Sequence, residues 1–434
     1  MILQKIFISL RILLFIIMLA NLTSASVLSS DTLSVDKHGQ LSVQGNRIVD
    51  KNGNPVVLHG MCLYWSQWKG QFYNYQCVQW LRDDWKCTVV RASMGVESGG
   101  YLTNPETEKA KIKTVIDACI DLGIYVIVDW HDHNAQNHLS QSISFFEEIA
   151  NDYTGIPNII YEIYNEPLGS VSWSGVVKPY ADSVAKHIRA IDSVNLIIVG
   201  SPNWSQDVDV AANNPLLYNN IAYTLHFYAA SHKQMYRNKA TAALNKNVAL
   251  FVSEFGTTES SGTGIIDSAE TNIWMKFMDD NKLSWCNWSI ADLTETSAAL
   301  KPGAAANGGW LDSDISISGL LIRRKLKEVY ESSITSVGTK SETPLNYELR
   351  QNYPNPFNPS TKISYSLPES ANVKIEIYNV LGQKVAVLVD RVEVAGNHSV
   401  PWDAHNISGG IYFYRIIAEG KRMFEKTQKL LLLR

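Results

Sequence analysis

The chain has 434 residues, which is too long for one small domain and enough for one large domain with an accessory module. A hydrophobic content of 45% is ordinary for a soluble globular protein, and a formal net charge of −4 gives no reason to expect nucleic acid or an anionic membrane as a partner. The 12 Trp and 20 Tyr are more informative, because rings that a core does not need can form flat platforms on a surface.

Residues 1–25 are predicted to be a secretory signal peptide. Lys5 and Arg11 precede or interrupt an apolar run at 12–20 that is short for a membrane span, and the small residues before position 26 suit cleavage after Ala25. The alternative is an uncleaved anchor. No later segment is apolar enough to cross a bilayer.

Five cysteines, an odd number for an exported chain, are spread along the sequence without CxxC spacing, so we expect no zinc site. Cys119 and Cys286 lie in apolar runs and are predicted to be buried thiols. The sequence does not decide whether Cys77 and Cys87 form a disulfide.

The first part of the chain predicts a (β/α)₈ TIM barrel, preceded by a hairpin within 41–53 that carries an Asn-Gly turn. Short apolar strands alternate with amphipathic segments such as 108–122, which implies parallel pairing. The predicted strands are 56–61, 88–94, 125–130, 159–165, 195–200, 221–227, 248–254 and 283–289. This is the number of strands that closes such a barrel, and a helix at 320–332 is expected to end it.

The composition and the pattern of predicted elements change after the barrel. We expect the catalytic barrel to occupy 26–332, a linker rich in Ser, Thr, Gly and Pro to occupy 333–346, and a second domain to occupy 347–434. Short alternating strands at 362–366, 373–379, 384–389, 396–401 and 410–419 predict a small all-β, immunoglobulin-like sandwich.

Two of the predicted barrel strands end in a glutamate. The strand at 159–165 runs into Asn165-Glu166-Pro167, and the strand at 248–254 ends at Glu254, followed by Phe255 and Gly256. Barrel enzymes carry their catalytic groups at the carboxyl ends of the strands. A pair of carboxyl groups at one barrel mouth is what glycoside hydrolysis requires, and in the retaining form they lie about 5–5.5 Å apart. The sequence therefore predicts a retaining glycoside hydrolase built around Glu166 and Glu254.

Other polar and aromatic residues stand at strand ends. Arg91 is placed to hydrogen-bond a catalytic carboxylate and keep it ionised, although an outward ion pair at the barrel rim is the alternative. The remaining strand-end residues are His131, His226, Tyr228 and Trp288. A metal site is an alternative for Asp129, His131, Asp132, His133 and His138, because His-x-His can chelate a metal. The third set of ligands is not obvious, however, and a paired-carboxylate mechanism needs no metal. We expect neither metal nor cofactor.

These motifs together resemble glycoside hydrolase family 5, and most closely its bacterial endo-β-1,4-glucanases. The resemblance runs from about residue 41 to 326 and includes Arg91, Trp130-His131, Asn165-Glu166-Pro167, His226-Phe227-Tyr228, Glu254-Phe255-Gly256 and Trp288. It implies that Glu166 is the acid/base and Glu254 the nucleophile of a double displacement. It also implies a monomer that acts on β-1,4-linked polysaccharide.

The resemblance assigns supporting roles as well. Asn165 would hydrogen-bond the sugar 2-hydroxyl, Arg91 and Tyr228 would position Glu254, and His131 and His226 would line the cleaved subsite. Trp288 and Trp68 would be stacking platforms on the glycone side, and Trp204 would be one on the aglycone side. Lys301 and Glu295 would bond sugar hydroxyl groups. The chain departs from similar bacillary cellulases at Tyr64, where they carry a histidine, and at Phe255, where they carry a tryptophan, so the fine substrate preference stays open.

The C-terminal region resembles the sorting domains of proteins exported by the type IX secretion system, through segments 352–359, 377–382, 402–403 and 409–415. That resemblance implies the secretion machinery as a partner and a secreted or surface-attached location. A carbohydrate-binding module is the alternative for this domain. For the barrel, the alternatives are the same mechanism on mannan, xylan or mixed-linkage glucan, and a catalytically silent carbohydrate-binding scaffold.

Overall fold

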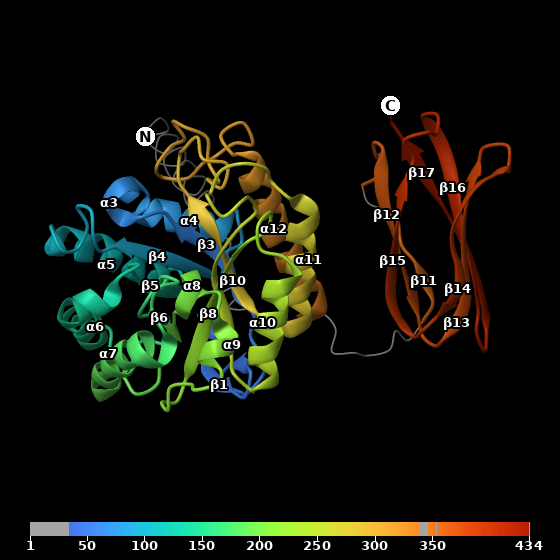
Figure 1. The fold of residues 1–434 in the computed structure, drawn as a ribbon. Coiled ribbons are helices and arrows are strands. Elements are labelled where there is room, and N and C mark those ends of the chain that lie inside the picture. Colours follow the sequence, from blue (N-terminus) through green and yellow to red (C-terminus); the bar gives the residue numbers. More distant parts are fainter. Residues whose placement is uncertain (1–33, 338–345, 353, 434) are drawn as a thin grey trace, which may run out of the picture. The chain divides into compact units, whose positions relative to one another are not determined.

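A computed structural model describes residues 34–337, 346–352 and 354–433. The predicted signal peptide, the middle of the predicted linker and Tyr353 lie outside these residues. The chain divides into two compact units, residues 1–330 and 331–434, shown as a ribbon in Figure 1. Among the described residues, none of the helices combines the length and the hydropathy that a membrane span requires.

The first unit is a closed parallel barrel of eight strands, which confirms the predicted fold. Its strands follow one another around the barrel in chain order, and β10 closes it against β3. The strands are β3 (His59–Leu63), β4 (Val89–Gly95), β5 (Tyr125–His131), β6 (Ile159–Glu162), β7 (Leu196–Val199), β8 (Ile221–Tyr228), β9 (Leu250–Gly256) and β10 (Ser284–Ile290).

Helices surround the barrel (Figure 1). They are α2 (Ser34–His38), α3 (Ser66–Lys69), η2 (Gly70–Phe72), α4 (Tyr75–Asp83), α5 (Pro105–Asp121), η3 (Ala135–His138), α6 (Leu139–Asp152), η4 (Trp173–Val177), α7 (Lys178–Ile191), α8 (Pro202–Ser205), α9 (Val208–Ala211), α10 (Gln234–Asn245), α11 (Ser268–Asn281) and α12 (Ile317–Val337).

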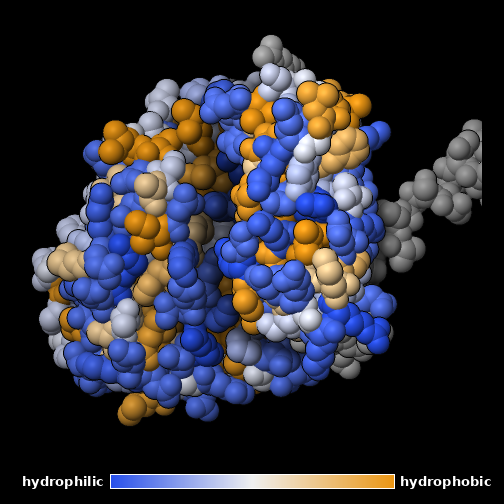
Figure 2. Space-filling model, turned by 90° about the vertical axis from the view of Figure 1, so that its right-hand side faces the viewer, coloured by the Kyte–Doolittle hydropathy of each residue, from blue (hydrophilic) through white to orange (hydrophobic). Residues whose placement is uncertain are grey.

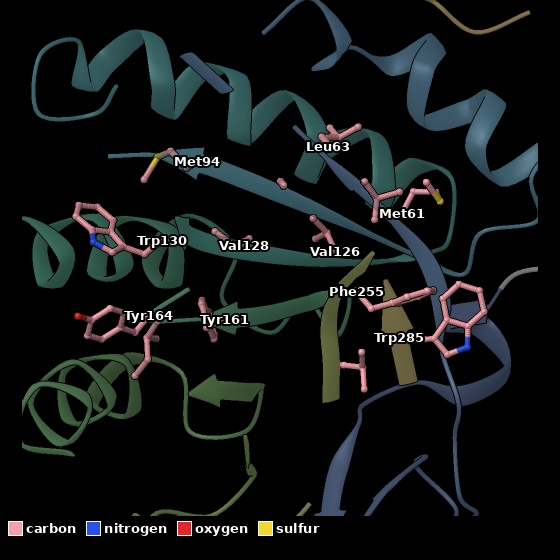
Figure 3. Packing of buried hydrophobic residues seen from close by; sticks show 14 of the residues in the cluster. Met61, Leu63, Met94, Val126, Val128, Trp130, Tyr161, Tyr164, Phe255 and Trp285 are labelled. Carbon is pink, nitrogen blue, oxygen red and sulfur yellow. The ribbon is translucent and has the colours of Figure 1, made fainter. Parts of the chain in front are cut away.

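Alternation along the strands sorts side chains into two layers. Val126, Val128 and Trp130 of β5 pack outward, in the apolar layer drawn in Figure 3, whereas Tyr125 and Ile127 point into the barrel. Towards the carboxyl end of the strands the inward positions become polar. The apolar filling of the barrel thus gives way to a charged mouth.

Two sequence predictions need correction at the start of the barrel. The first strand is predicted at 56–61 but lies at 59–63. The Leu58 N–H donates to the Ser284 hydroxyl, and only the Leu58 carbonyl accepts from the neighbouring strand, from the Trp285 N–H (2.8 Å). The hairpin of β1 (Ser42–Gln44) and β2 (Arg47–Val49) turns at Gly45-Asn46, not at Asn52-Gly53. The latter pair forms a separate turn, in which Asp50 accepts backbone N–H groups.

The second unit has two antiparallel sheets, ordered β11-β12-β15 and β14-β13-β16-β17, in agreement with the predicted sandwich. Its strands are β11 (Glu348–Leu349), β12 (Ser360–Leu367), β13 (Ala371–Asn379), β14 (Lys384–Glu393), β15 (Gly396–Asp403), β16 (Gly410–Glu419) and β17 (Met423–Leu432). Sequence analysis missed β11 and β17. Residues from both sheets share one apolar core, which includes Tyr365 and Tyr414.

All five cysteines are buried and free, so Cys77 and Cys87 are not joined. The face of the molecule shown in Figure 2 is mostly hydrophilic, and its hydrophobic residues form small separate groups. That surface agrees with the ordinary composition of the chain.

Candidate active site

Glu166 lies four residues beyond the end of β6, at the barrel mouth. The intervening backbone is held in place: the Asn165 N–H donates to the Trp130 carbonyl (3.3 Å), and the Glu166 N–H donates to the Asp132 carbonyl (3.4 Å). Its carboxylate contacts two imidazoles, His226 Nδ1 at 2.9 Å from Oε1 and His133 Nε2 at 3.3 Å from Oε2. These bonds fix both the main chain and the side chain of Glu166.

A β-bulge in β9 directs Glu254 into the barrel. Thr224 and His226 of β8 pair with Phe251 and Glu254 of β9, so β9 contains one extra residue over this interval. As a result Ser253 and Glu254 both face inward, while Phe255 joins the outer apolar layer. Strict alternation would have turned either the serine or the glutamate away.

The two glutamates come together across the mouth. One oxygen of Glu166, one oxygen of Glu254 and a ring nitrogen of His226 all lie within 4.8 Å of one another. Glu254 is 4% exposed and receives a hydrogen bond from the Tyr228 hydroxyl (3.0 Å) and an ion pair from Arg91 (2.9 Å). The two carboxyl groups are thus close to one another and have different partners.

Arg91 connects four groups beneath the site and is fully buried. Its guanidinium donates to Glu254, to Glu162 (2.7 Å) and to the Asn165 side-chain oxygen (2.6 Å), and it forms an ion pair with Asp129 (2.9 Å). The predicted contact with a strand-end carboxylate, that of Glu254, is present, and the rim ion pair is excluded. Because the amide oxygen of Asn165 faces Arg91, its Nδ2 points away and has no partner within the described part of the chain.

His226 links Glu166 to a buried carboxylate that sequence analysis missed. Its Nε2 lies 3.1 Å from the Ser253 hydroxyl, which donates to Glu162 at 2.5 Å. Glu162 sits on the same strand that precedes Glu166, but nothing in the local sequence distinguishes it from an outward-facing residue. Only the barrel geometry places it under the histidine.

Charges in this cluster shift its proton affinities. Burial lowers the pKa of His226, but the charge of Glu254 and hydrogen bonds to Glu162 and Glu166 outweigh burial and raise it to about 10. Burial likewise raises the pKa of Glu166, but hydrogen bonds from His133 and His226 lower it to about 2. For Glu254, burial raises the pKa, against the opposing charges of His226 and Arg91. In the free protein the proton of the Glu166–His226 pair therefore resides on the histidine.

This assignment predicts a pH dependence of barrel stability. The pKa of His226 is higher in the folded state than its ordinary value of 6.5, so its stabilisation is complete below about pH 6.5 and is lost as the pH rises towards about 10. We expect the free energy of unfolding to fall by about 5 kcal/mol across that interval. Urea unfolding followed by tryptophan fluorescence measures it, and only Trp402 of the 12 Trp lies in the second unit. If the free energy of unfolding of His226→Gln fell with pH as steeply as that of the unmodified protein, the assignment would be contradicted.

Aromatic residues extend from the carboxylates to one side. Trp288 stacks on His131 with a centroid distance of 5.3 Å and is only 4% exposed, so one face of the predicted platform is already covered. Tyr64 lies between Trp288 (5.2 Å) and Trp68 (6.4 Å), and Trp68 is 51% exposed. Trp68 therefore offers the larger free surface of the two predicted platforms.

The other side of the site is a cavity of about 420 Å³. Its lining residues are Glu166, Asn203, Trp204, Gln206, His226, Tyr228, His232, Tyr236 and Ser260. Trp204, 43% exposed, is held by an unusual backbone in which three successive residues have left-handed φ values, Asn203 (60°), Trp204 (54°) and Ser205 (57°). Bonds from the Trp204 N–H to the Pro167 carbonyl (2.8 Å) and from the Ser205 hydroxyl to the Asn165 carbonyl (2.6 Å) secure the turn.

The remaining predicted site residues have partners of their own. Glu295 is bonded to Ser297, and burial raises its pKa. Lys301 is exposed, and its ammonium donates to the Ser313 carbonyl (2.8 Å). His131 Nδ1 is bonded to Asp129 (2.6 Å), which leaves Nε2 as its second polar atom. His133, considered only for a metal, is a partner of Glu166 instead.

Comparison with known proteins identifies both units. Residues 49–293 match the family model of the cellulases, glycosyl hydrolase family 5. This chain belongs to glycosyl hydrolase family 5. It is a glycoside hydrolase of the cellulase class, as the resemblance implied. Residues 351–431 match the secretion system C-terminal sorting domain, so this family 5 enzyme is exported, secreted or attached to the cell surface.

Individual relatives agree with the family. An endoglucanase of Clostridium saccharobutylicum is 43% identical over 339 residues, which cover 77% of this chain and 76% of the relative. A solved structure from Cytophaga hutchinsonii is 52% identical, with a TM-score of 0.69 over 70% of this chain and 99% of that one. The catalytic domain of a Thermobifida fusca endoglucanase is 35% identical (TM-score 0.66, 68% and 99% covered), and a glutamine variant of it has been solved with cellotetraose.

Proposed function

We propose that this family 5 enzyme is a retaining endo-β-1,4-glucanase that hydrolyses internal bonds of cellulose and related β-glucans. The observation that carries the proposal is the pair Glu166 and Glu254, whose carboxylate oxygens approach within 4.8 Å at the ends of two barrel strands. Endoglucanases among the relatives, and cellotetraose bound to one of them, support the substrate class. The cavity beside Glu166 and the exposed ring of Trp68 suit a substrate that extends beyond the cleaved sugar.

Glu254 is proposed as the nucleophile. In the first step its carboxylate attacks the anomeric carbon while the bond to the leaving sugar oxygen breaks, which gives a covalent glycosyl-enzyme. Arg91 and Tyr228 support this role, because both donate to the carboxylate and favour its ionised form.

Glu166 is proposed as the acid/base. It protonates the leaving oxygen in the first step, and in the second it removes a proton from the water that displaces Glu254. Since the free protein holds the proton on His226, the acid form arises when the proton moves along the 2.9 Å bond from His226 Nδ1 to Glu166. Glu166 regains a proton from water in the second step, so the cycle balances.

Surrounding residues are proposed to bind the sugars. The unpartnered Nδ2 of Asn165 suits a hydrogen bond to the 2-hydroxyl of the sugar that is cleaved, and His131 Nε2 suits another hydroxyl of that sugar. Trp68, with Tyr64 and Trp288, offers stacking surface on the glycone side, and Trp204 does so on the aglycone side. Glu295 and Lys301 are proposed to bond hydroxyl groups of the substrate. The enzyme is proposed to act as a monomer.

Stereochemistry at the released anomeric centre tests the mechanism. Two displacements at one carbon restore its configuration, so proton NMR of a soluble β-1,4-glucan digest should show the β-anomer first. Initial α-anomer would mean inversion and would remove Glu254 as the nucleophile. A mannan digested in parallel tests the proposed substrate. If the enzyme hydrolysed only the mannan, the proposed mechanism would stand, but the substrate would be a mannan and not a β-glucan.

A further inference from the structure

Glu166 is held by two histidines that differ in their access to solvent. His226 is 1% exposed, and its second nitrogen is directed into the barrel towards Ser253. His133 lies at the other carboxylate oxygen, with its Nε2 at 3.3 Å, and its side chain is 35% exposed. The oxygen that His226 does not occupy is thus the one next to His133.

The position of His133 is fixed by its surroundings. It follows β5 by two residues, and its carbonyl accepts a hydrogen bond from the Tyr164 hydroxyl (3.1 Å). Its ring meets the ring of Trp65 edge-on at a centroid distance of 5.6 Å. A histidine held at both its backbone and its ring is a built contact to Glu166 and not a surface side chain that happens to reach it.

We propose that His133 is a positioning residue for Glu166, and that its hydrogen bond to the second carboxylate oxygen sets the upper pH limit of catalysis. The proposal rests on the proposed role of Glu166 as the acid. It adds a residue that neither the strand-end pattern nor the resemblance selected.

The direction of the effect follows from the charges. Burial lowers the pKa of His133, but the hydrogen bond and charge of Glu166 outweigh burial and raise it, which favours the cationic form of the ring. A cationic donor favours the ionised carboxylate and weakens proton binding by the Glu166–His226 pair. Without His133 the pair keeps its proton to higher pH, so the alkaline limb of activity moves upward.

Other charged or titratable groups face this pair from the neighbouring strands and segments. They are Glu254 from β9, His226 and Tyr228 from β8, His131 from β5, and Asp132 and His232 from the segments after β5 and β8. All of them remain when His133 alone is replaced. A shift in the pH profile of that variant therefore reports the contact of His133.

The test is the pH dependence of kcat/KM for the full chain, its His133→Gln and His133→Phe variants, and a control. Glutamine keeps a neutral donor, and phenylalanine keeps the ring without a donor. The control is His138→Gln, because His138 belongs to the same segment but bonds to Asp132 (2.7 Å) and not to Glu166. Each protein is assayed on cellotetraose and on 2,4-dinitrophenyl β-cellobioside, whose leaving group needs no acid.

We expect the alkaline limb on cellotetraose to move upward by about one pH unit in both His133 variants and to stay in place in His138→Gln. A uniform loss of kcat/KM at every pH, or a downward shift, would overturn the proposal, since a merely structural contact gives no upward shift. The activated substrate distinguishes a failure of the His133 proposal from a failure of the proposed function. If the unmodified protein shows the same alkaline limb on both substrates, Glu166 is not the acid, and the proposed function fails with it.

Discussion

Glu254→Gln is expected to lower kcat/KM on cello-oligosaccharides by about four orders of magnitude or more, because a neutral amide cannot form the glycosyl-enzyme. The fold should survive the change. Burial already raises the pKa of Glu254, so the site tolerates a neutral side chain of the same shape, and Arg91 keeps Glu162 and Asp129 as partners. Steady-state kinetics together with a urea unfolding curve measure the two effects separately.

Glu166→Gln provides the contrast. It should lose activity on cellotetraose to a similar extent, yet form the glycosyl-enzyme from 2,4-dinitrophenyl β-cellobioside, because the dinitrophenolate departs without a proton.

Azide rescue tests the two roles independently. Azide added to a Glu166→Gly variant should give the β-glycosyl azide, and azide added to a Glu254→Gly variant should give the α-glycosyl azide. Exchange of these two products would reverse the roles of the carboxylates. Glu295→Gln, at the rim of the same mouth, is the matched control and should alter mainly KM.

Arg91→Met should be the most destabilising single change considered in the barrel, at about 3–5 kcal/mol. The guanidinium is completely buried, and its removal leaves Asp129, Glu162 and Glu254 without their common cation. Chemical denaturation at neutral pH gives the loss. Activity should fall as well, because Glu254 loses one of its two donors.

The size of this loss should depend on pH. Burial raises the pKa of Glu162, but Arg91 and His226 outweigh burial and lower it, so its stabilising contribution is present above the ordinary value and is lost in acid. In Arg91→Met the carboxylate is uncompensated, and protonation relieves it, so the deficit should shrink as the pH falls. A deficit equal at pH 7 and pH 4 would show that the arginine acts through packing alone. Arg237→Met, which breaks the ion pair with Glu270 between α10 and α11, is the control and should leave activity intact.

The barrel and its two glutamates were predictable because their signals are local. Apolar strands alternate with amphipathic helices, and each glutamate follows an apolar run, so order along the chain was enough to place them at one mouth. The first strand is predicted too early because Val56 and Leu58 look like strand residues, but the Val56 N–H donates to the Ile48 carbonyl of the hairpin and the Leu58 N–H to the Ser284 side chain. In the second unit, β17 is an alternating strand with mostly polar outward residues and was not recognised.

What the sequence did not show depends on register and distance. The bulge that turns Glu254 inward exists only relative to the partners of β9 on β8 and β10. Glu162 and Ser253 meet beneath His226 although 91 residues separate them. His133 resembles one half of a metal-binding pair until the fold shows its partner to be Glu166. These contacts follow from the closed barrel and not from any motif.

The left-handed turn at Asn203–Ser205 has a mechanical consequence. Each residue in that conformation costs about 1–2 kcal/mol, so the turn persists only because the surrounding bonds hold it. Those bonds run to the carbonyls of Asn165 and Pro167, the two neighbours of Glu166. Trp204 and Glu166, the proposed aromatic platform and the proposed acid/base, thus share one support. In the proposed function, a sugar ring that stacks on Trp204 meets a pre-ordered surface at a fixed distance from Glu166, so little conformational entropy remains to be lost on binding.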